Sequence, residues 1–190
     1  MKFDPQKHHR RSIRLKGYDY TQAGAYFVTM VTYQREPLFG EIVDGEMRLS
    51  PMGQIAEEHW RAIPDHFPHV ELGAYVIMPN HVHGIIIITD GGGGTPWRAP
   101  TTHAPTDNIE KFGKPVSGSL ATIIRQYKSS VTRRIQNELY GLDTSSPAIW
   151  QRNYYEHIIR SEAEYHRIHR YIESNVDNWI KDNENPVKSK

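Results

Sequence analysis

Residues 70–89, VELGAYVIMPNHVHGIIIIT, decide the fold. They hold two apolar runs, and Pro79-Asn80 stands between the runs. Proline cannot donate a hydrogen bond within a sheet, and both residues are common in turns, so the dipeptide favours a tight connection between two strands. We therefore predict two paired strands at the centre of a sheet.

The residues before this stretch predict a further strand and a hairpin. Beginning at Ala25, the run AYFVTMVTY is β-branched and aromatic, as is typical of a buried strand. Residues 41–43 and 46–49 flank Asp44-Gly45, a dipeptide that suits the positive dihedral angles of a tight hairpin turn.

Helical signals follow at three places. Ser50 and Pro51 provide an N-cap and a first helical residue for a helix that should end near Pro64. The last helix should begin at Ser161, because Glu164 stands where a capping box needs a carboxylate that reaches back. Between these two, a long helix should bury Leu120, Ile124, Tyr127, Val131 and Ile135, and the last helix should bury Ile168, Ile172, Val176 and Trp179.

The order of these elements is strands, helix, strands, helix, strand and helix, without the regular alternation of a parallel sheet. We therefore expect an α+β fold with an antiparallel sheet of four to five strands, ferredoxin-like or RRM-like, and helices packed on it. A chain of 190 residues and 22.0 kDa suits one domain over residues 1–190. A basic arm at 1–16 and a flexible insert at 90–117, rich in Gly, Pro and Thr, belong to this domain.

Composition restricts the classes of function. The 23 Lys and Arg nearly balance the 22 Asp and Glu, so any surface for nucleic acid must be local. The absence of cysteine excludes disulfides and thiolate metal sites. No apolar stretch approaches about 18 residues, so we expect a cytoplasmic protein without a membrane partner.

The His81 and His83 pair is the first chemical signal. Side chains alternate along a strand, so both imidazoles should project to one side and could bind one metal ion. The spacing alone is a weak signal in a chain with 11 histidines.

The predicted last helix supplies the second signal. Tyr171 and Asn175 are four residues apart and should share one face with Glu164, Arg167 and Asn178. The Tyr171 hydroxyl would then face a cleft, and the Asn175 oxygen would complete the metal site. Alternatively, Tyr171 is a half-buried packing residue. Spacing does not choose among Tyr171 and the other candidates, which are Tyr127, Tyr154, Tyr155 and Tyr165.

Two strings resemble the HUH endonucleases: PNHVHGIII matches the His-hydrophobic-His motif, and YIESN resembles a catalytic tyrosine followed by an amide. The chain is most similar to single-tyrosine HUH transposases, especially the REP-associated tyrosine transposases. GAYFVTMVTYQREPLFGEI, GSLATIIRQYKSSVTRRI and IWQRNYYEHIIRSEAEYHRIHRYI extend the resemblance over residues 17–179. The resemblance implies Tyr171 as nucleophile and His81, His83 and Asn175 as metal ligands. Val176 departs from the family, in which Pro commonly follows this Asn.

The resemblance also implies Mg²⁺ or Mn²⁺, a covalent 5′-phosphotyrosine, and single-stranded or hairpin DNA as substrate. Relatives often act as homodimers, whereas REP-associated members can act alone. The basic residues expected to contact DNA are Arg10, Arg11, Arg14, Lys16, Arg125, Lys128 and Arg152. Two other functions stay open: a non-catalytic RRM-like module that binds single strands, and a structural zinc site at the histidine pair.

Overall fold

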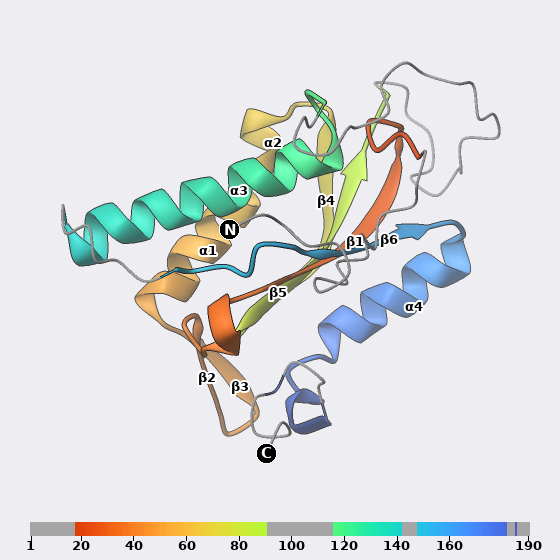
Figure 1. Cartoon of the computed structure of the whole chain (residues 1–190). Coiled ribbons are helices and arrows are strands. Elements are labelled where there is room, and N and C mark those ends of the chain that lie inside the picture. The colour runs from red at the N-terminus through yellow and green to blue at the C-terminus, as the bar shows by residue number, and fades with distance from the viewer. Residues whose placement is uncertain (1–17, 91–115, 142–147, 182–184, 186–190) are drawn as a thin grey trace, which may run out of the picture.

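The computed structural model describes residues 18–90, 116–141, 148–181 and 185 (Figure 1). The predicted arm at 1–16 and nearly all of the predicted insert at 90–117 lie outside these residues. No helix in the described ranges is long and apolar enough to cross a membrane.

A four-stranded antiparallel sheet with strand order β4-β5-β1-β6 forms the centre of the molecule. Its strands are β1 (Gly24–Val31), β4 (Val70–Met78), β5 (His81–Ile88) and β6 (Tyr155–Ile159). A separate hairpin consists of β2 (Gly40–Val43) and β3 (Glu46–Leu49), and its turn residues Asp44 and Gly45 have φ of 54° and 81°. The predicted α+β fold and the predicted turn are confirmed.

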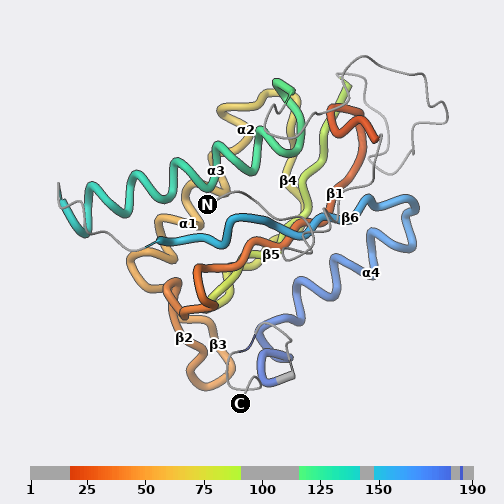
Figure 2. Tube along the Cα trace, viewed as in Figure 1, coloured from red at the N-terminus to blue at the C-terminus, as the bar shows by residue number. Residues whose placement is uncertain are grey.

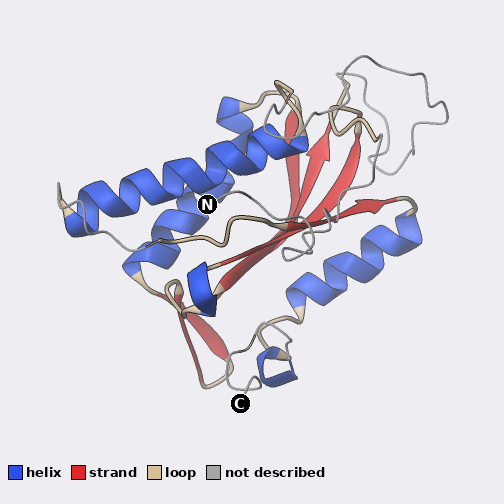
Figure 3. Ribbon diagram, viewed as in Figure 1, coloured by secondary structure: helices blue, strands red, loops and turns tan. Residues whose placement is uncertain are grey.

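Helices cover both faces of this sheet (Figures 1 and 3). They are α1 (Pro51–Arg61), α2 (Ile63–His66), α3 (Leu120–Ile135) and α4 (Glu162–Glu173), with shorter turns at η1 (Tyr33–Arg35), η2 (Gln136–Tyr140) and η3 (Trp179–Lys181). Ser50 caps α1 as predicted, because its Oγ accepts a hydrogen bond from the Gly53 amide at 3.1 Å. α1 and α3 pack on one face, and α4 packs on the other.

Strand alternation assigns each residue to one of the two faces. Tyr26 and Val28 of β1 are buried with α1 and α3, whereas Phe27 between them is buried with Ile168 and Ile172 of α4. In β5 the even-numbered residues likewise belong to the first core and the odd-numbered residues to the second. His81 and His83 are odd-numbered, so both face α4.

Gly84, next to His83, allows α1 to approach β5 closely. A Cβ atom at Gly84 would lie 2.2 Å from a ring atom of Trp60, so any other residue would displace this buried indole. Only glycine therefore permits this packing behind the histidine face.

α4 begins beside the end of β6 and crosses the sheet towards β4 and β5 (Figure 2). It ends at Glu173, so the prediction that Val176 and Trp179 continue its buried stripe was wrong. After Ser174 the chain turns through a hydrogen bond from the Asn175 amide to the Ile172 carbonyl at 3.2 Å. This turn directs Asn175 inwards, towards the start of β5.

Candidate active site

His83 is fixed by contacts at both ring nitrogens. Its Nδ1 lies 2.8 Å from Thr29 Oγ1, and its Nε2 lies 3.2 Å from the Tyr171 hydroxyl. Both contacts are satisfied when Tyr171 donates to Nε2 and the Nδ1–H donates to Thr29. Thr29 is directly opposite His83 in the β1–β5 register, so the sheet itself provides this partner. In this tautomer the Nε2 lone pair points towards α4.

His81 is held in the equivalent tautomer by Asn80. The Asn80 Nδ2 donates to the Arg35 carbonyl at 3.1 Å, which orients the amide so that its Oδ1 accepts from His81 Nδ1 at 2.9 Å. The pKa of His81 is lowered to about 3, mainly by burial and also by the positive charge of Arg35, while a hydrogen bond with Asn175 acts in the opposite direction. His81 is therefore neutral at physiological pH, and the proton on Nδ1 leaves the lone pair on Nε2.

The two imidazoles are close together and shielded from water. Their ring centroids are 4.4 Å apart, and His81 and His83 are 0% and 4% exposed. The centroid of the Trp179 ring lies 5.9 Å from that of His81. This contact explains why Trp179 is partly buried although it lies beyond the end of α4. The arrangement is a buried pair of lone-pair donors.

Asn175 brings an oxygen atom to the same place. It is 2% exposed, and its Oδ1 is buried without a hydrogen bond of good geometry to any residue that the structure describes. A buried carbonyl oxygen in this state costs free energy unless something binds it. Within the described ranges, no three His, Cys, Asp or Glu residues gather as a metal site. Asn175, which interacts with His81, provides an amide oxygen beside the histidine pair. His81, His83 and Asn175 thus fit a divalent ion.

Tyr171 is the tyrosine that meets this cluster through its hydroxyl. The residue is 45% exposed, and the centroid of its ring lies 5.3 Å from that of His83 and 6.1 Å from that of Phe27. By contrast, Tyr127 is buried on the opposite face and donates to the Ala56 carbonyl. Of the other candidates, Tyr154 packs against the α1 and α3 core, and Tyr165 is partly buried between α4 and β4.

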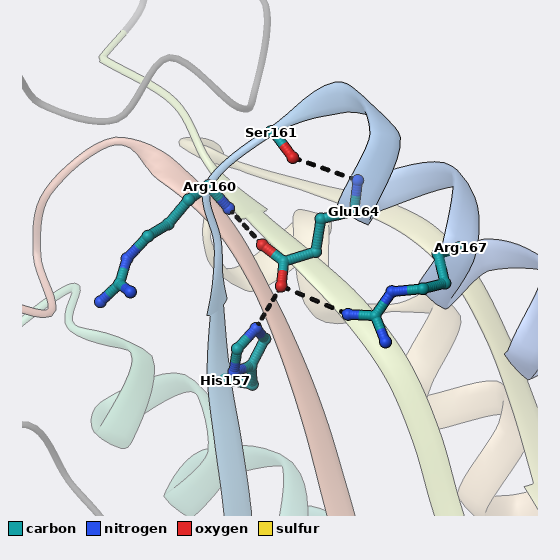
Figure 4. Close-up of polar contacts among 5 residues, drawn as sticks. All are labelled: His157, Arg160, Ser161, Glu164 and Arg167. Carbon is teal, nitrogen blue, oxygen red and sulfur yellow. Dashed lines mark hydrogen bonds and ion pairs between the residues drawn. The ribbon is translucent and has the colours of Figure 1, made fainter.

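A cluster of polar contacts anchors the start of α4 (Figure 4). Ser161 Oγ accepts from the Glu164 amide at 3.2 Å, and the Glu164 carboxylate accepts from the Arg160 amide and from His157 Nε2, each at 2.8 Å. Burial alone would raise the pKa of Glu164, but these hydrogen bonds outweigh it and lower the pKa. The predicted Ser161 cap is confirmed, and the Glu164 carboxylate reaches back to the amide of Arg160, one residue before the N-cap. Through His157 the same carboxylate ties α4 to β6.

The residues predicted to contact DNA are dispersed. Arg125 and Arg152 are exposed, with Arg125 on α3, across the sheet from Tyr171. The Lys128 ammonium donates to the Gln151 and Asn153 carbonyls, each at 2.9 Å, and burial lowers its pKa to about 8. Arg10, Arg11, Arg14 and Lys16 lie outside the described residues.

Sequence reasoning missed the residues that orient the histidines. Thr29 could have been found only from the strand register, whereas Asn80 is adjacent to His81 and was interpreted only as a turn residue. The Arg35 carbonyl that accepts the hydrogen bond from Asn80 belongs to the loop after β1, in which Gln34 and Arg35 have φ of 54° and 60°. Residues other than glycine rarely adopt such backbone angles, and residues held in them are common near functional sites.

The chain matches no protein-family model. It is 39% identical over 186 residues to an uncharacterised protein of Haemophilus influenzae, covering 95% of this chain and 96% of the relative. A REP-associated tyrosine transposase, solved bound to a REP hairpin, superposes with a TM-score of 0.54 and 19% identity, covering 90% of this chain and 73% of that one. A candidate transposase of Deinococcus radiodurans gives a TM-score of 0.45 and 18% identity, covering 85% and 97% of the two chains. The chain therefore belongs to the family of the Haemophilus influenzae protein, and it has the fold of the REP-associated tyrosine transposase.

Proposed function

We propose that this protein is a transposase that cuts and rejoins single-stranded DNA through a covalent 5′-phosphotyrosine at Tyr171, with Mg²⁺ or Mn²⁺. The observation that carries the proposal is the contact between the Tyr171 hydroxyl and His83 Nε2, at 3.2 Å. It brings a nucleophile, a buried histidine pair and the buried oxygen of Asn175 together on one face of the sheet. The fold shared with a tyrosine transposase agrees with this chemistry.

His81 Nε2, His83 Nε2 and Asn175 Oδ1 are the atoms that would hold the metal ion. A bound divalent ion would withdraw electron density from the scissile phosphate and stabilise the charge that develops during its displacement. Imidazole ligands suit Mn²⁺ better than Mg²⁺, while the amide oxygen suits both. Because the metal would take the lone pair of His83 Nε2, the Tyr171 hydroxyl would give up its hydrogen bond there. That hydroxyl would then be available to a phosphate.

In the proposed reaction the Tyr171 oxygen attacks phosphorus, and its proton passes to water. The bond between phosphorus and the 3′ oxygen breaks, and that oxygen leaves as a 3′ hydroxyl after taking a proton from water. One phosphodiester replaces another, so no nucleotide cofactor is needed. Attack by the 3′ hydroxyl of a second strand releases Tyr171 and joins the DNA.

Single-stranded DNA beside a hairpin is the proposed substrate. A single strand lets its backbone enter a site between α4 and the sheet more readily than a rigid duplex. The fold relative was solved bound to a REP hairpin, which supports this choice. Arg152, together with the basic residues at 1–16, provides the proposed phosphate contacts, whereas Arg125 on the opposite face could contact only DNA that extends around the sheet. A homodimer remains part of the proposal and requires its own measurement.

Selection of covalent adducts tests this function without a known target sequence. The protein is incubated with Mn²⁺ and a library of DNA hairpins flanked by randomised single strands, and adducts that survive denaturation are sequenced. We expect recurrent cleavage sites with wild type and with Tyr165→Phe, and no adduct with Tyr171→Phe. A Tyr171→Phe adduct, or no adduct from wild type, would contradict the proposal. Binding of single strands without an adduct would favour the RRM-like module instead.

A further inference from the structure

Tyr155 is an exposed aromatic side chain at the edge of the sheet. It is the first residue of the edge strand β6, and 42% of its surface is exposed. The register places Tyr155 opposite Thr29, and Thr29 opposite His83. Residues directly opposite one another project from the same face, so Tyr155 stands in one cross-strand row with His83.

Phe27 joins Tyr155 to the candidate nucleophile. The Phe27 ring lies 6.2 Å from that of Tyr155 and 6.1 Å from that of Tyr171, with interplanar angles of 68° and 82°. Both tyrosines therefore pack edge-on against a single ring, which is 9% exposed. Each tyrosine keeps nearly half of its own surface in solvent, so two exposed rings flank the Phe27 ring.

The oblique path of α4 explains why Tyr155 is uncovered. The helix is tied to β6 at His157, through Glu164, and then crosses towards β4 and β5. Tyr155, two residues earlier on the same face of β6, stays outside the helix. Its hydroxyl makes no hydrogen bond with any residue in the described ranges. A ring and a polar edge are both available to a ligand.

We propose that Tyr155 forms a nucleobase-stacking site beside the scissile phosphate. This inference rests on the function proposed above. Two strand spacings separate β6 from β5, so the backbones of Tyr155 and His83 are about 10 Å apart. A nucleotide adjacent to a phosphate at Tyr171 would place its base within this distance. Every base has an aromatic face, so stacking tolerates any sequence.

Charge and position favour a nucleobase over another occupant. Phe27, Tyr171, Thr29 and His83 are linked to Tyr155 by ring contacts or by the cross-strand row, and none of them is a carboxylate. The Glu164 carboxylate on this face is bound to His157. Exposed aromatic residues also occur elsewhere, as at Tyr140, which is 37% exposed at the end of η2. Tyr155 differs because it shares Phe27 with the candidate nucleophile. Tyr140 therefore provides a matched control.

The test separates binding from chemistry. In a Tyr171→Phe background without metal, the affinity for a short fluorescent oligothymidylate is compared with that for an abasic chain of equal length. We expect Tyr155→Ala and Tyr155→Leu to weaken oligothymidylate binding roughly 5- to 100-fold, and Tyr155→Phe and Tyr140→Ala to leave it unchanged. Affinity for the abasic chain should be the same in all variants.

Three results would overturn the stacking site: unchanged affinity in Tyr155→Ala, an equal loss on the abasic chain, or an equal loss in Tyr140→Ala. With Tyr171 restored, adduct formation provides the independent readout. If wild type forms adducts but the Tyr155 variants bind oligothymidylate as tightly as the parent protein, the stacking site is refuted and the proposed function stands. A complete lack of adducts from wild type would refute the function itself.

Discussion

Replacing Thr29 with Val removes one hydroxyl while nearly conserving side-chain volume. Thr29 and His83 are 7% and 4% exposed, so water cannot replace the 2.8 Å hydrogen bond between Oγ1 and Nδ1. A buried polar group left without its partner costs about 1–3 kcal/mol in the free energy of unfolding. Loss of the group that orients a metal-binding histidine typically weakens metal affinity by about 10- to 100-fold. We expect Thr29→Val to show both losses.

Electron paramagnetic resonance measures this affinity directly, because the signal of free Mn²⁺ falls as the ion binds. Thr29→Ser retains the hydroxyl and should bind Mn²⁺ within about threefold of wild type. Thr132→Val is the matched control, since the Thr132 hydroxyl donates to the Lys128 carbonyl within α3, on the other face. The reasoning is refuted if Thr29→Val binds Mn²⁺ as wild type does, or if Thr132→Val loses as much affinity.

Three further substitutions probe the site and its supports. Asn175→Asp places a buried carboxylate at the proposed third ligand, so without metal the melting temperature should fall. Mn²⁺ affinity should rise roughly tenfold. If calorimetry gives the variant the same Mn²⁺ affinity as wild type, Asn175 is not a ligand. Glu164→Gln should reduce the free energy of unfolding by about 0.5–1 kcal/mol at pH 7. Because the pKa of Glu164 is lowered in the fold, the carboxylate stabilises above its unfolded pKa of about 4.3, and the difference should vanish as denaturant titrations move to lower pH. The pKa of Lys128 is lowered from 10.5 to about 8, so wild type should gain stability relative to Lys128→Met as pH rises between these values; parallel stability curves would contradict the burial of this ammonium.

The strands could be predicted because local signals agreed with the tertiary structure. Pro79-Asn80, Asp44-Gly45 and the Ser50 cap each act through the backbone of their own turn, so a sequence is enough to locate them. The same alternation that makes β5 a strand also predicted that His81 and His83 share a face. The sequence could not show that α4 packs on that face, because this depends on how the strands and helices are arranged in the fold.

The site shows where local periodicity fails. Val176 and Trp179 continue the helical spacing of Ile168 and Ile172, yet α4 ends at Glu173. Trp179 packs against His81 instead, and this non-local contact has no signature in the spacing. Asn175 was expected beside the histidines as part of a helix face; the structure brings it there through a turn. Likewise, Thr29 became visible only when the register paired β1 with β5.

The central claim is that Tyr171 becomes covalently bound to DNA. Digestion of the denatured adduct with a protease and a nuclease, followed by tandem mass spectrometry, identifies the modified residue and the end of the DNA that it carries. We predict a nucleotide joined through its 5′ phosphate to Tyr171, with the partner strand ending in a 3′ hydroxyl. A nucleotide on another residue, or a 3′-phosphate linkage at Tyr171, would contradict this account.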